Sequence, residues 1–167
     1  MNEAENSVGQ SEPPLPGESA ILRQYIKNLG LYFEEYDIPA IGGEILGLLS
    51  IAQQPLSQED MMDVLNVSRS SVSTNLRSLL MAGLVERVSV VGERSDAYAL
   101  SDDALSELLE IRLEKARNLG EILQAGLSGL PEGHSARQRV QDMLDWASLV
   151  ENAYQNVLTQ WKARLNT

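Results

Sequence analysis

The sequence predicts a mainly α-helical fold that carries a small β-hairpin and ends in a long helical hairpin. Three observations lead to this fold class. Two short, capped helical patterns succeed each other between residues 57 and 82, and a β-branched stretch with its return strand follows over residues 84–100. Two long amphipathic patterns then fill residues 101–167. At 167 residues the chain suits one domain with an appended helical element.

The middle of the chain is where the local signals are strongest. Ser57 and Asp60 have the spacing of a capping box at the start of one helix. Asn66 interrupts that helix, Ser68 is placed to cap the next one, and Gly83 ends it. Helix, turn, helix and β-hairpin together predict a winged helix-turn-helix.

The second helix of this motif presents a small, hydroxylated and sparingly basic face, because its apolar residues fall on the other side. Such a face suits insertion into the major groove of double-stranded DNA. The residues expected to contact base edges or phosphates are Ser68, Arg69, Ser70, Ser73, Thr74 and Arg77.

Arg94, at the tip of the predicted wing, is the candidate for the minor groove. Each arginine also has an alternative role in a surface ion pair. Arg69 and Arg77 can pair with Glu59 or Asp63, and Arg94 can pair with acids in its own loop.

The formal net charge of the chain is −11, from 24 acidic and 13 basic residues. Residues 67–100 hold four basic and three acidic residues, whereas the segments before and after them are acidic. Because phosphate neutralisation drives DNA binding, residues 67–100 are the segment best suited to approach nucleic acid.

Two helices are predicted before the motif. A second helix from Pro39 to about Ala52 contains three glycines that indicate a close helix–helix approach, since the P-loop pattern is lacking. Pro55–Ser57 can add a third short strand. The glycines of this second helix are Gly42, Gly43 and Gly47. The first helix is predicted over residues 18–36, and its apolar side consists of Leu22, Tyr25, Ile26, Leu29, Phe33 and Tyr36.

The last region predicts two long helices, to about Ser128 and from about Ser135 to Leu165. A small winged domain cannot cover both, so an antiparallel hairpin that forms a homodimer is expected. The predicted buried residues of the first helix are Leu105, Leu109, Leu113, Ala116, Leu119, Leu123 and Leu127. In the second helix, a coiled-coil-like seam is predicted at Val140, Met143, Ala147, Val150, Tyr154, Val157 and Trp161.

The chain is therefore expected to have three regions. Residues 1–17 are acidic, polar and proline-rich at their end, which predicts a disordered acidic tail. Residues 18–100 form the winged helix-turn-helix with its N-terminal helix, and residues 101–167 form the helical dimerisation region.

The middle half of the chain also resembles a known family. The motifs are Gly43-Glu44-Ile45-Leu46-Gly47-Leu48-Leu49, Val67-Ser68-Arg69-Ser70-Ser71-Val72-Ser73-Thr74, Gly83-Leu84-Val85 and Gly92-Glu93-Arg94. They are similar to those of MarR-type transcriptional regulators, and most similar to the branch typified by the glycine betaine synthesis regulator, GbsR. The resemblance implies a homodimeric repressor whose DNA affinity is modulated by a small-molecule effector.

The resemblance also gives the aromatic residues two readings. One is packing in the core and at an interface. The other is an effector pocket that could hold a quaternary ammonium through cation–π attraction. The candidate residues are Tyr25, Tyr32, Phe33, Tyr36 and Trp146.

Enzymatic and metal sites are not expected. The chain has no cysteine, and its one histidine, His134, lies in an inter-helix turn where a cap or an exposed side chain is the ordinary role. We expect no enzyme activity, no cofactor and no metal. A winged-helix protein–protein adaptor with little DNA affinity is the alternative function.

No apolar run approaches the roughly 20 residues that cross a bilayer. The N-terminus also lacks the basic and apolar regions of a secretory signal. We therefore expect a cytoplasmic protein with no membrane partner.

Overall fold

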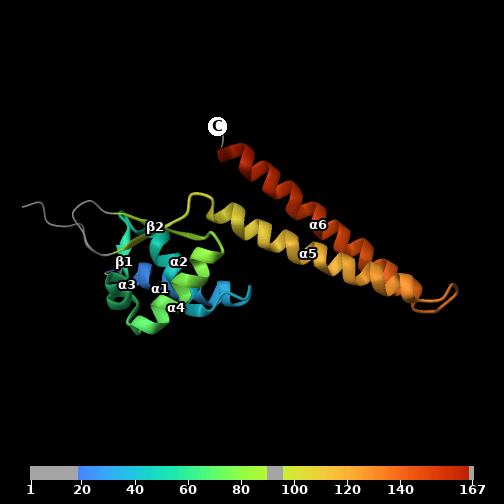
Figure 1. Cartoon of the computed structure of the whole chain (residues 1–167), viewed down its shortest axis with the longest axis horizontal. Helices are drawn as coiled ribbons and strands as arrows, with labels where there is room; N and C mark the ends of the chain where they lie inside the picture. Colours follow the sequence, from blue (N-terminus) through green and yellow to red (C-terminus); the bar gives the residue numbers. More distant parts are fainter. Residues whose placement is uncertain (1–18, 90–95, 166–167) are drawn as a thin grey trace, which may run out of the picture. The chain divides into compact units, whose positions relative to one another are not determined.

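The computed structural model describes residues 19–89 and 96–165. The predicted acidic tail and Arg94 lie outside the described residues. Contacts divide the chain into two compact units (Figure 1). The first comprises the chain up to Met81 together with Val85–Leu100, and the second comprises Ala82–Leu84 and the chain from Ser101 onward.

In the first unit, α1 (Ala20–Glu34) packs closely on α2 (Ala40–Ile51). A Cβ atom built on Gly43 would lie 2.9 Å from the Cα of Gly30 and 2.9 Å from the carbonyl oxygen of Leu29. The two backbones therefore touch where neither helix carries a side chain. The close approach expected of the glycines of α2 is confirmed, and Gly30 is its counterpart on α1.

One ion pair lies across this packed surface. Glu44 sits in the buried stretch of α2, and its Oε2 accepts a hydrogen bond from Lys27 Nζ of α1 at 2.6 Å. The side chain of Lys27 is 57% exposed, whereas that of Glu44 is 10% exposed. Because a buried carboxylate without a partner is costly, Lys27 compensates the charge that α2 carries into the core.

The helix-turn-helix follows as α3 (Gln58–Leu65) and α4 (Arg69–Met81). The predicted capping box is present: Ser57 Oγ accepts the backbone N–H of Asp60, and Asp60 Oδ2 accepts that of Ser57. Asn66 ends α3 with φ 54°, and Gly83 follows α4 with φ 70°. Both turns therefore use residues that tolerate the left-handed region.

Three short strands complete the first unit, in the order β1-β3-β2. β3 (Ala97–Leu100) pairs antiparallel with β2 (Val85–Val88) and with β1 (Leu56–Ser57). The third strand expected at Pro55–Ser57 is therefore present. Tyr98 of β3 is buried and stands opposite Leu56 in β1.

The second unit is a hairpin of α5 (Ala104–Gly129) and α6 (Arg137–Leu165), which run antiparallel, side by side (Figure 1). Arg117 of α5 donates to Glu151 Oε1 and Gln155 Oε1 of α6, both at 3.1 Å. Near the start of α5 and the end of α6, Lys162 Nζ donates to Glu110 Oε1 at 2.5 Å. This hydrogen bond raises the pKa of Lys162 above 10.5.

The C-terminal end of α5 is capped from the next helix. Arg137, the first residue of α6, donates from Nη1 to the carbonyl oxygens of Leu127 at 3.1 Å and Leu130 at 2.6 Å. The carbonyl oxygen of Leu127 also accepts the backbone N–H of Leu130 at 3.3 Å. Because the last carbonyls of a helix lack the N–H donors of a following turn, Arg137 adds to this local cap.

Within the single chain, the seam predicted for α6 is buried at some positions and exposed at others. Ala147 is buried as predicted, but Met143 and Val157 are exposed, and the residue buried beside Val157 is Leu158. Leu105, assigned to the buried stripe of α5, is also exposed. Successive residues of a helix point about 100° apart, so a choice between adjacent positions decides which flank of the helix meets its neighbour.

Over the ranges 19–89 and 96–165, none of the helices combines the length and apolar content that crossing a membrane requires.

Candidate nucleic-acid interface

The exposed face of α4 matches the face expected from the sequence. Val72, Leu76 and Leu79 are buried, and they hold the helix against the rest of the first unit. On the opposite side, Ser70, Thr74 and Arg77 are exposed, and Ser73 is half-buried at the edge. At about 100° per residue, these four side chains fall within roughly one third of the helix circumference.

Ser68 fixes the start of this helix. Its Oγ accepts the backbone N–H of Ser71 at 3.3 Å, and it exchanges hydrogen bonds of 3.0 Å with the hydroxyls of Ser70 and Ser71. The predicted cap is therefore present. The first turn of α4 thus presents hydroxyl groups and the positive end of a helix dipole, which is a setting that favours phosphate.

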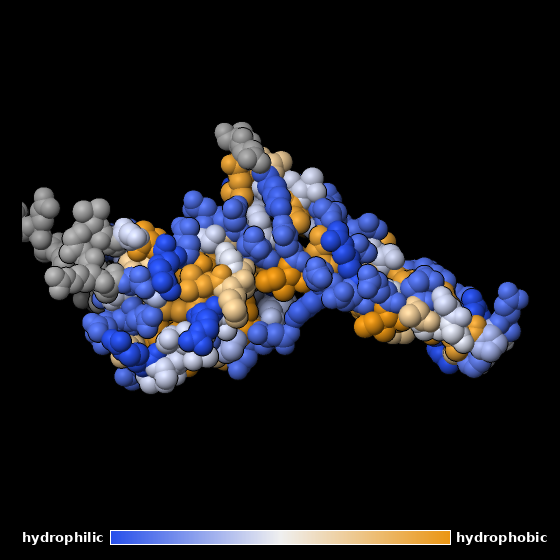
Figure 2. Space-filling model, in the orientation of Figure 1, coloured by the Kyte–Doolittle hydropathy of each residue, from blue (hydrophilic) through white to orange (hydrophobic). Residues whose placement is uncertain are grey.

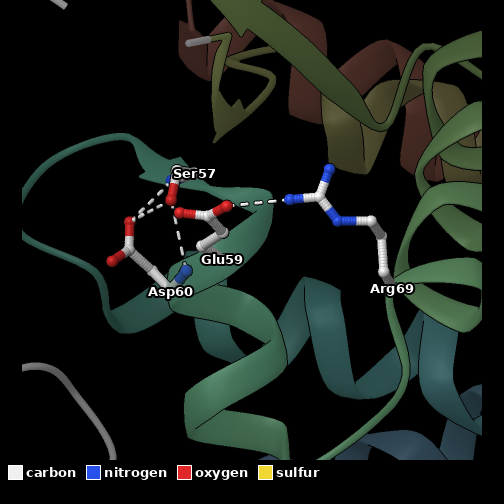
Figure 3. A network of polar contacts seen from close by, with 4 residues as sticks. All are labelled: Ser57, Glu59, Asp60 and Arg69. Carbon is white, nitrogen blue, oxygen red and sulfur yellow. Dashed lines mark hydrogen bonds and ion pairs between the residues drawn. The ribbon is translucent and has the colours of Figure 1, made fainter.

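Arg69 does not stand free at this end. Its Nη2 donates to Glu59 Oε1 of α3 at 2.8 Å, and the two side chains reach toward each other from the first turns of their helices (Figure 3). The alternative ion pair that the sequence allowed for Arg69 is therefore formed. Both side chains are well exposed, at 66% for Arg69 and 75% for Glu59.

Arg77 differs from Arg69 because its side chain is exposed two turns further along α4. Among the residues that the structure describes, it forms no ion pair with Glu59, Asp63 or any other acid. Arg77 is thus the arginine of α4 whose charge is available at the middle of the exposed face.

The wing adds an arginine that the sequence argument passed over. Arg87 of β2 pairs with Asp96 at 3.3 Å, and its guanidinium carbon lies 5.9 Å from the ring centre of Tyr98, its cross-strand neighbour. Tyr98 OH in turn accepts a hydrogen bond from Gln58 Nε2 at the start of α3. Alternation along the strand puts Arg87 and Ser89 on the side opposite to Val88, and this is the signal that the sequence offers for an exposed Arg87.

The aromatic candidates fall into separate groups. Tyr32 lies 5.4 Å from Phe33 and 5.0 Å from Tyr36, between ring centres, so three of the residues form one cluster at the end of α1. Tyr25 stands apart and exchanges a 2.9 Å hydrogen bond with Ser50 of α2. Trp146 belongs to α6 in the second unit, where it is exposed.

His134 has a structural role in the turn between α5 and α6, where its Nδ1 accepts the backbone N–H of Ala136 at 3.1 Å. Within the described part of the chain, no group of three or more His, Asp or Glu side chains could hold a metal ion.

Two family models match different parts of the chain. Residues 36–95, from the end of α1 to the wing, match the model of the MarR family. Residues 103–164, the helical hairpin, match that of MmpR5-like MarR family transcriptional regulators. Both models describe MarR-family proteins, and together with the relatives below they support a winged-helix, DNA-binding transcriptional regulator of that family. The coarse family resemblance seen in the sequence is thus confirmed.

Individual relatives agree with the family assignment. The chain is 26% identical over 150 residues to the HTH-type transcriptional regulator MmpR5 of Mycobacterium tuberculosis, covering 89% of this chain and 91% of that protein. It is 23% identical over 79 residues to the putative HTH-type transcriptional regulator YvaV of Bacillus subtilis, covering 47% and 45%.

A solved structure agrees with the fold. A crystal structure of a transcriptional regulator aligns with a TM-score of 0.67 and 26% identity over 86% of this chain and 99% of that chain. The predicted fold class, a winged helix-turn-helix with a long C-terminal helical region, is confirmed. The relatives described here are regulators rather than enzymes.

Proposed function

We propose that this MarR-family regulator is a homodimeric repressor that reads a two-fold symmetric DNA site with α4 and releases it when a small molecule binds. The observation that carries the proposal is the exposed face of α4. It combines three hydroxyl side chains with the unpaired charge of Arg77, on a helix whose start is fixed by Ser68. Arginine paired with guanine O6 and N7 is the commonest specific contact in the major groove.

The geometry of a dimer sets a prediction for the operator. Two copies of α4 related by a two-fold axis would contact half-sites about 10–10.5 bp apart, or a multiple of that spacing. Arg94 is proposed to reach the minor groove beside each half-site. A cytoplasmic location follows from this function, because the DNA target lies there.

The function can be tested with the full chain by fluorescence anisotropy. The duplex upstream of its own gene and a scrambled duplex of equal composition are titrated between about 50 and 200 mM salt. We expect tighter binding to the upstream duplex and a log K that falls as log salt rises. Absence of binding to both duplexes at low salt would contradict the proposal and favour the protein–protein adaptor.

Arg77→Ala tests the face itself. If Arg77 reads a base, the variant loses about 1–3 kcal/mol of binding to the upstream duplex and little to the scrambled one. Arg139→Ala, which removes the same charge from an exposed position of α6, is the control. Equal losses in the two variants would show that net charge, rather than α4, determines the affinity.

The homodimer is proposed from the apolar face of α6, defined here as Met143, Trp146, Leu149 and Val157. All four side chains are exposed, and Trp146 and Leu149 are 59% and 69% exposed. Figure 2 shows apolar residues at the surface of the hairpin. Exposed apolar surface of this kind is typical of protein interfaces, and a second copy of the chain would cover it.

The dimer can be tested by light scattering after size exclusion. We expect a mass twice that of the 18.4 kDa chain and a shift toward the monomer for Trp146→Glu. Thr159→Glu adds the same charge to the other side of α6 and should leave the mass unchanged. A monomeric unaltered chain would contradict this part of the proposal.

The effector is proposed to be a small cation that contacts the cluster of Tyr32, Phe33 and Tyr36. Electron-rich ring faces attract quaternary ammonium groups, and the resemblance to the GbsR-like branch supports the same chemistry. Choline should release the protein from its duplex, whereas the neutral isostere 3,3-dimethylbutanol should not. Release by both compounds, or by neither, would argue against the cation and against placement in that branch.

Repression is separable from DNA binding. A reporter driven by the upstream DNA should give higher output when the chain is absent than when it is present. Lower output in its absence would identify an activator.

A further inference from the structure

The start of α3 is held by several hydrogen bonds next to the proposed DNA-reading helix α4. Ser57 and Asp60 close a reciprocal capping box, with Ser57 Oγ also donating to Asp60 Oδ2 at 2.7 Å (Figure 3). Ser57 belongs to β1 and pairs with Ala97 of β3, and the next residue, Gln58, donates to buried Tyr98. The backbone that carries Glu59 is therefore fixed on both sides, while its side chain remains exposed.

Arg69 is fixed at its base in a similar way, since it is the first residue of α4 and follows the capping residue Ser68. Its guanidinium uses one N–H donor, at Nη2, in the hydrogen bond to Glu59 Oε1. A guanidinium has five N–H donors in a rigid fork, so the pair leaves the greater part of the fork unused.

Stability does not explain the pair. Both side chains are more than half exposed, and an exposed ion pair changes a folding equilibrium by about five-fold at most. The pair also acts on DNA binding, because Glu59 cancels the charge that Arg69 would contribute to any phosphate backbone. Contacts of basic side chains with phosphate are independent of sequence, and together they account for essentially all of non-specific binding.

The same contact restricts the directions in which Arg69 can point. A free arginine side chain has many rotamers that are lost when it binds. The ion pair with Glu59 removes part of this rotamer freedom in the protein without DNA, so less conformational entropy is lost on binding. The pair should therefore weaken binding to arbitrary DNA sequences. It should weaken binding less for a DNA sequence whose acceptor groups lie where the guanidinium of Arg69 already points. Sequence discrimination is the difference between these two affinities, so it should increase.

We propose that Glu59 is a positioning residue for Arg69 and sets the sequence discrimination of this regulator. Glu59 directs the guanidinium and suppresses its non-specific attraction to phosphate. The inference rests on the proposed DNA-reading role of α4.

The test uses the full chain and three variants, Glu59→Gln, Arg69→Ala and the double variant, with a duplex selected from a random library by the unaltered protein and a scrambled duplex. Glu59→Gln should bind the scrambled duplex about five-fold more tightly, with a salt slope steeper by about one charge per protomer. The ratio of the two affinities should fall by a similar factor. In the Arg69→Ala background, Glu59→Gln should leave that ratio unchanged.

Asp63→Asn is the matched control, since it removes one exposed acid from the same helix without touching Arg69. It should raise both affinities together. A fall in the affinity ratio as large in Asp63→Asn as in Glu59→Gln would overturn the inference, because net charge alone would then account for the result. An unchanged ratio in Glu59→Gln would also overturn it.

The two proposals fail in different ways. If the unaltered chain selects no duplex, the DNA-reading role of α4 fails and the role of Glu59 fails with it. If the chain selects a duplex and Arg77→Ala weakens its binding, but Glu59→Gln leaves the affinity ratio unchanged, only the role of Glu59 is overturned.

Discussion

Replacing Gly43 with alanine should loosen the packing of α1 on α2, although alanine is the better helix former. The added Cβ would stand 2.9 Å from each of three atoms: the Cα of Gly30, the carbonyl oxygen of Leu29 and the Cβ of Phe33. Two of these are backbone atoms, so no side-chain rotation relieves the contact. The helices must move apart, and the ion pair of Lys27 and Glu44 lies across the same surface.

The magnitude follows from two opposing terms. Overpacking a well-packed site costs about 1–3 kcal/mol, and contacts with backbone place Gly43 at the upper end of that range. Alanine recovers about 1 kcal/mol through its helix propensity. The net expectation is a loss of about 2 kcal/mol in the free energy of unfolding of the first unit.

Urea unfolding followed by far-ultraviolet circular dichroism measures the loss. Amide hydrogen exchange along α1 shows where it occurs. Gly126→Ala is the control, because Gly126 lies inside α5 and a Cβ there would meet no atom within 4 Å. It should raise stability by about 0.5–1 kcal/mol. The packing argument would be refuted if the two substitutions changed stability in the same direction, or if exchange along α1 stayed as slow as in the unaltered chain.

Two further substitutions test polar contacts between helices. Lys27→Met leaves the largely buried carboxylate of Glu44 without its partner and should cost about 1–2 kcal/mol, less than a fully buried pair because water reaches Lys27. Urea unfolding measures it, and an unchanged stability, or no recovery on adding Glu44→Gln, would contradict the compensating role of Lys27. Arg137→Met removes two hydrogen bonds from the end of α5 and should cost about 1–3 kcal/mol. Tryptophan fluorescence reports it, since both tryptophans lie in α6, and an unaltered urea midpoint would show that water replaces the cap.

The candidate site shows where local sequence signals end. Ser68 could be recognised as a cap, and the exposed side of α4 could be recognised from helical spacing. Helical spacing did not decide whether Arg69 contacts DNA or an acidic residue of α3. In the structure, Arg69 forms an ion pair with Glu59. Arg94 stays a prediction for the minor groove, while Arg87 was visible as an exposed strand residue whose contacts with Asp96 and Tyr98 the sequence could not specify.

The sequence by itself determined the elements whose signals lie within a few residues of one another. The capping box at Ser57, the turn at Asn66 and the stop at Gly83 each depend on backbone groups one turn away or nearer, and each is found where it was expected.

Tertiary structure decided what depends on the rotation of one helix against another. It decided that Gly30 meets Gly43, that Glu44 is carried into the core, that Arg137 caps α5, and that Leu158 rather than Val157 is buried. The physical reason is that neighbouring residues on a helix point about 100° apart, so a pattern that allows either of two adjacent residues leaves open which flank is buried. Packing of the partner helix makes that choice.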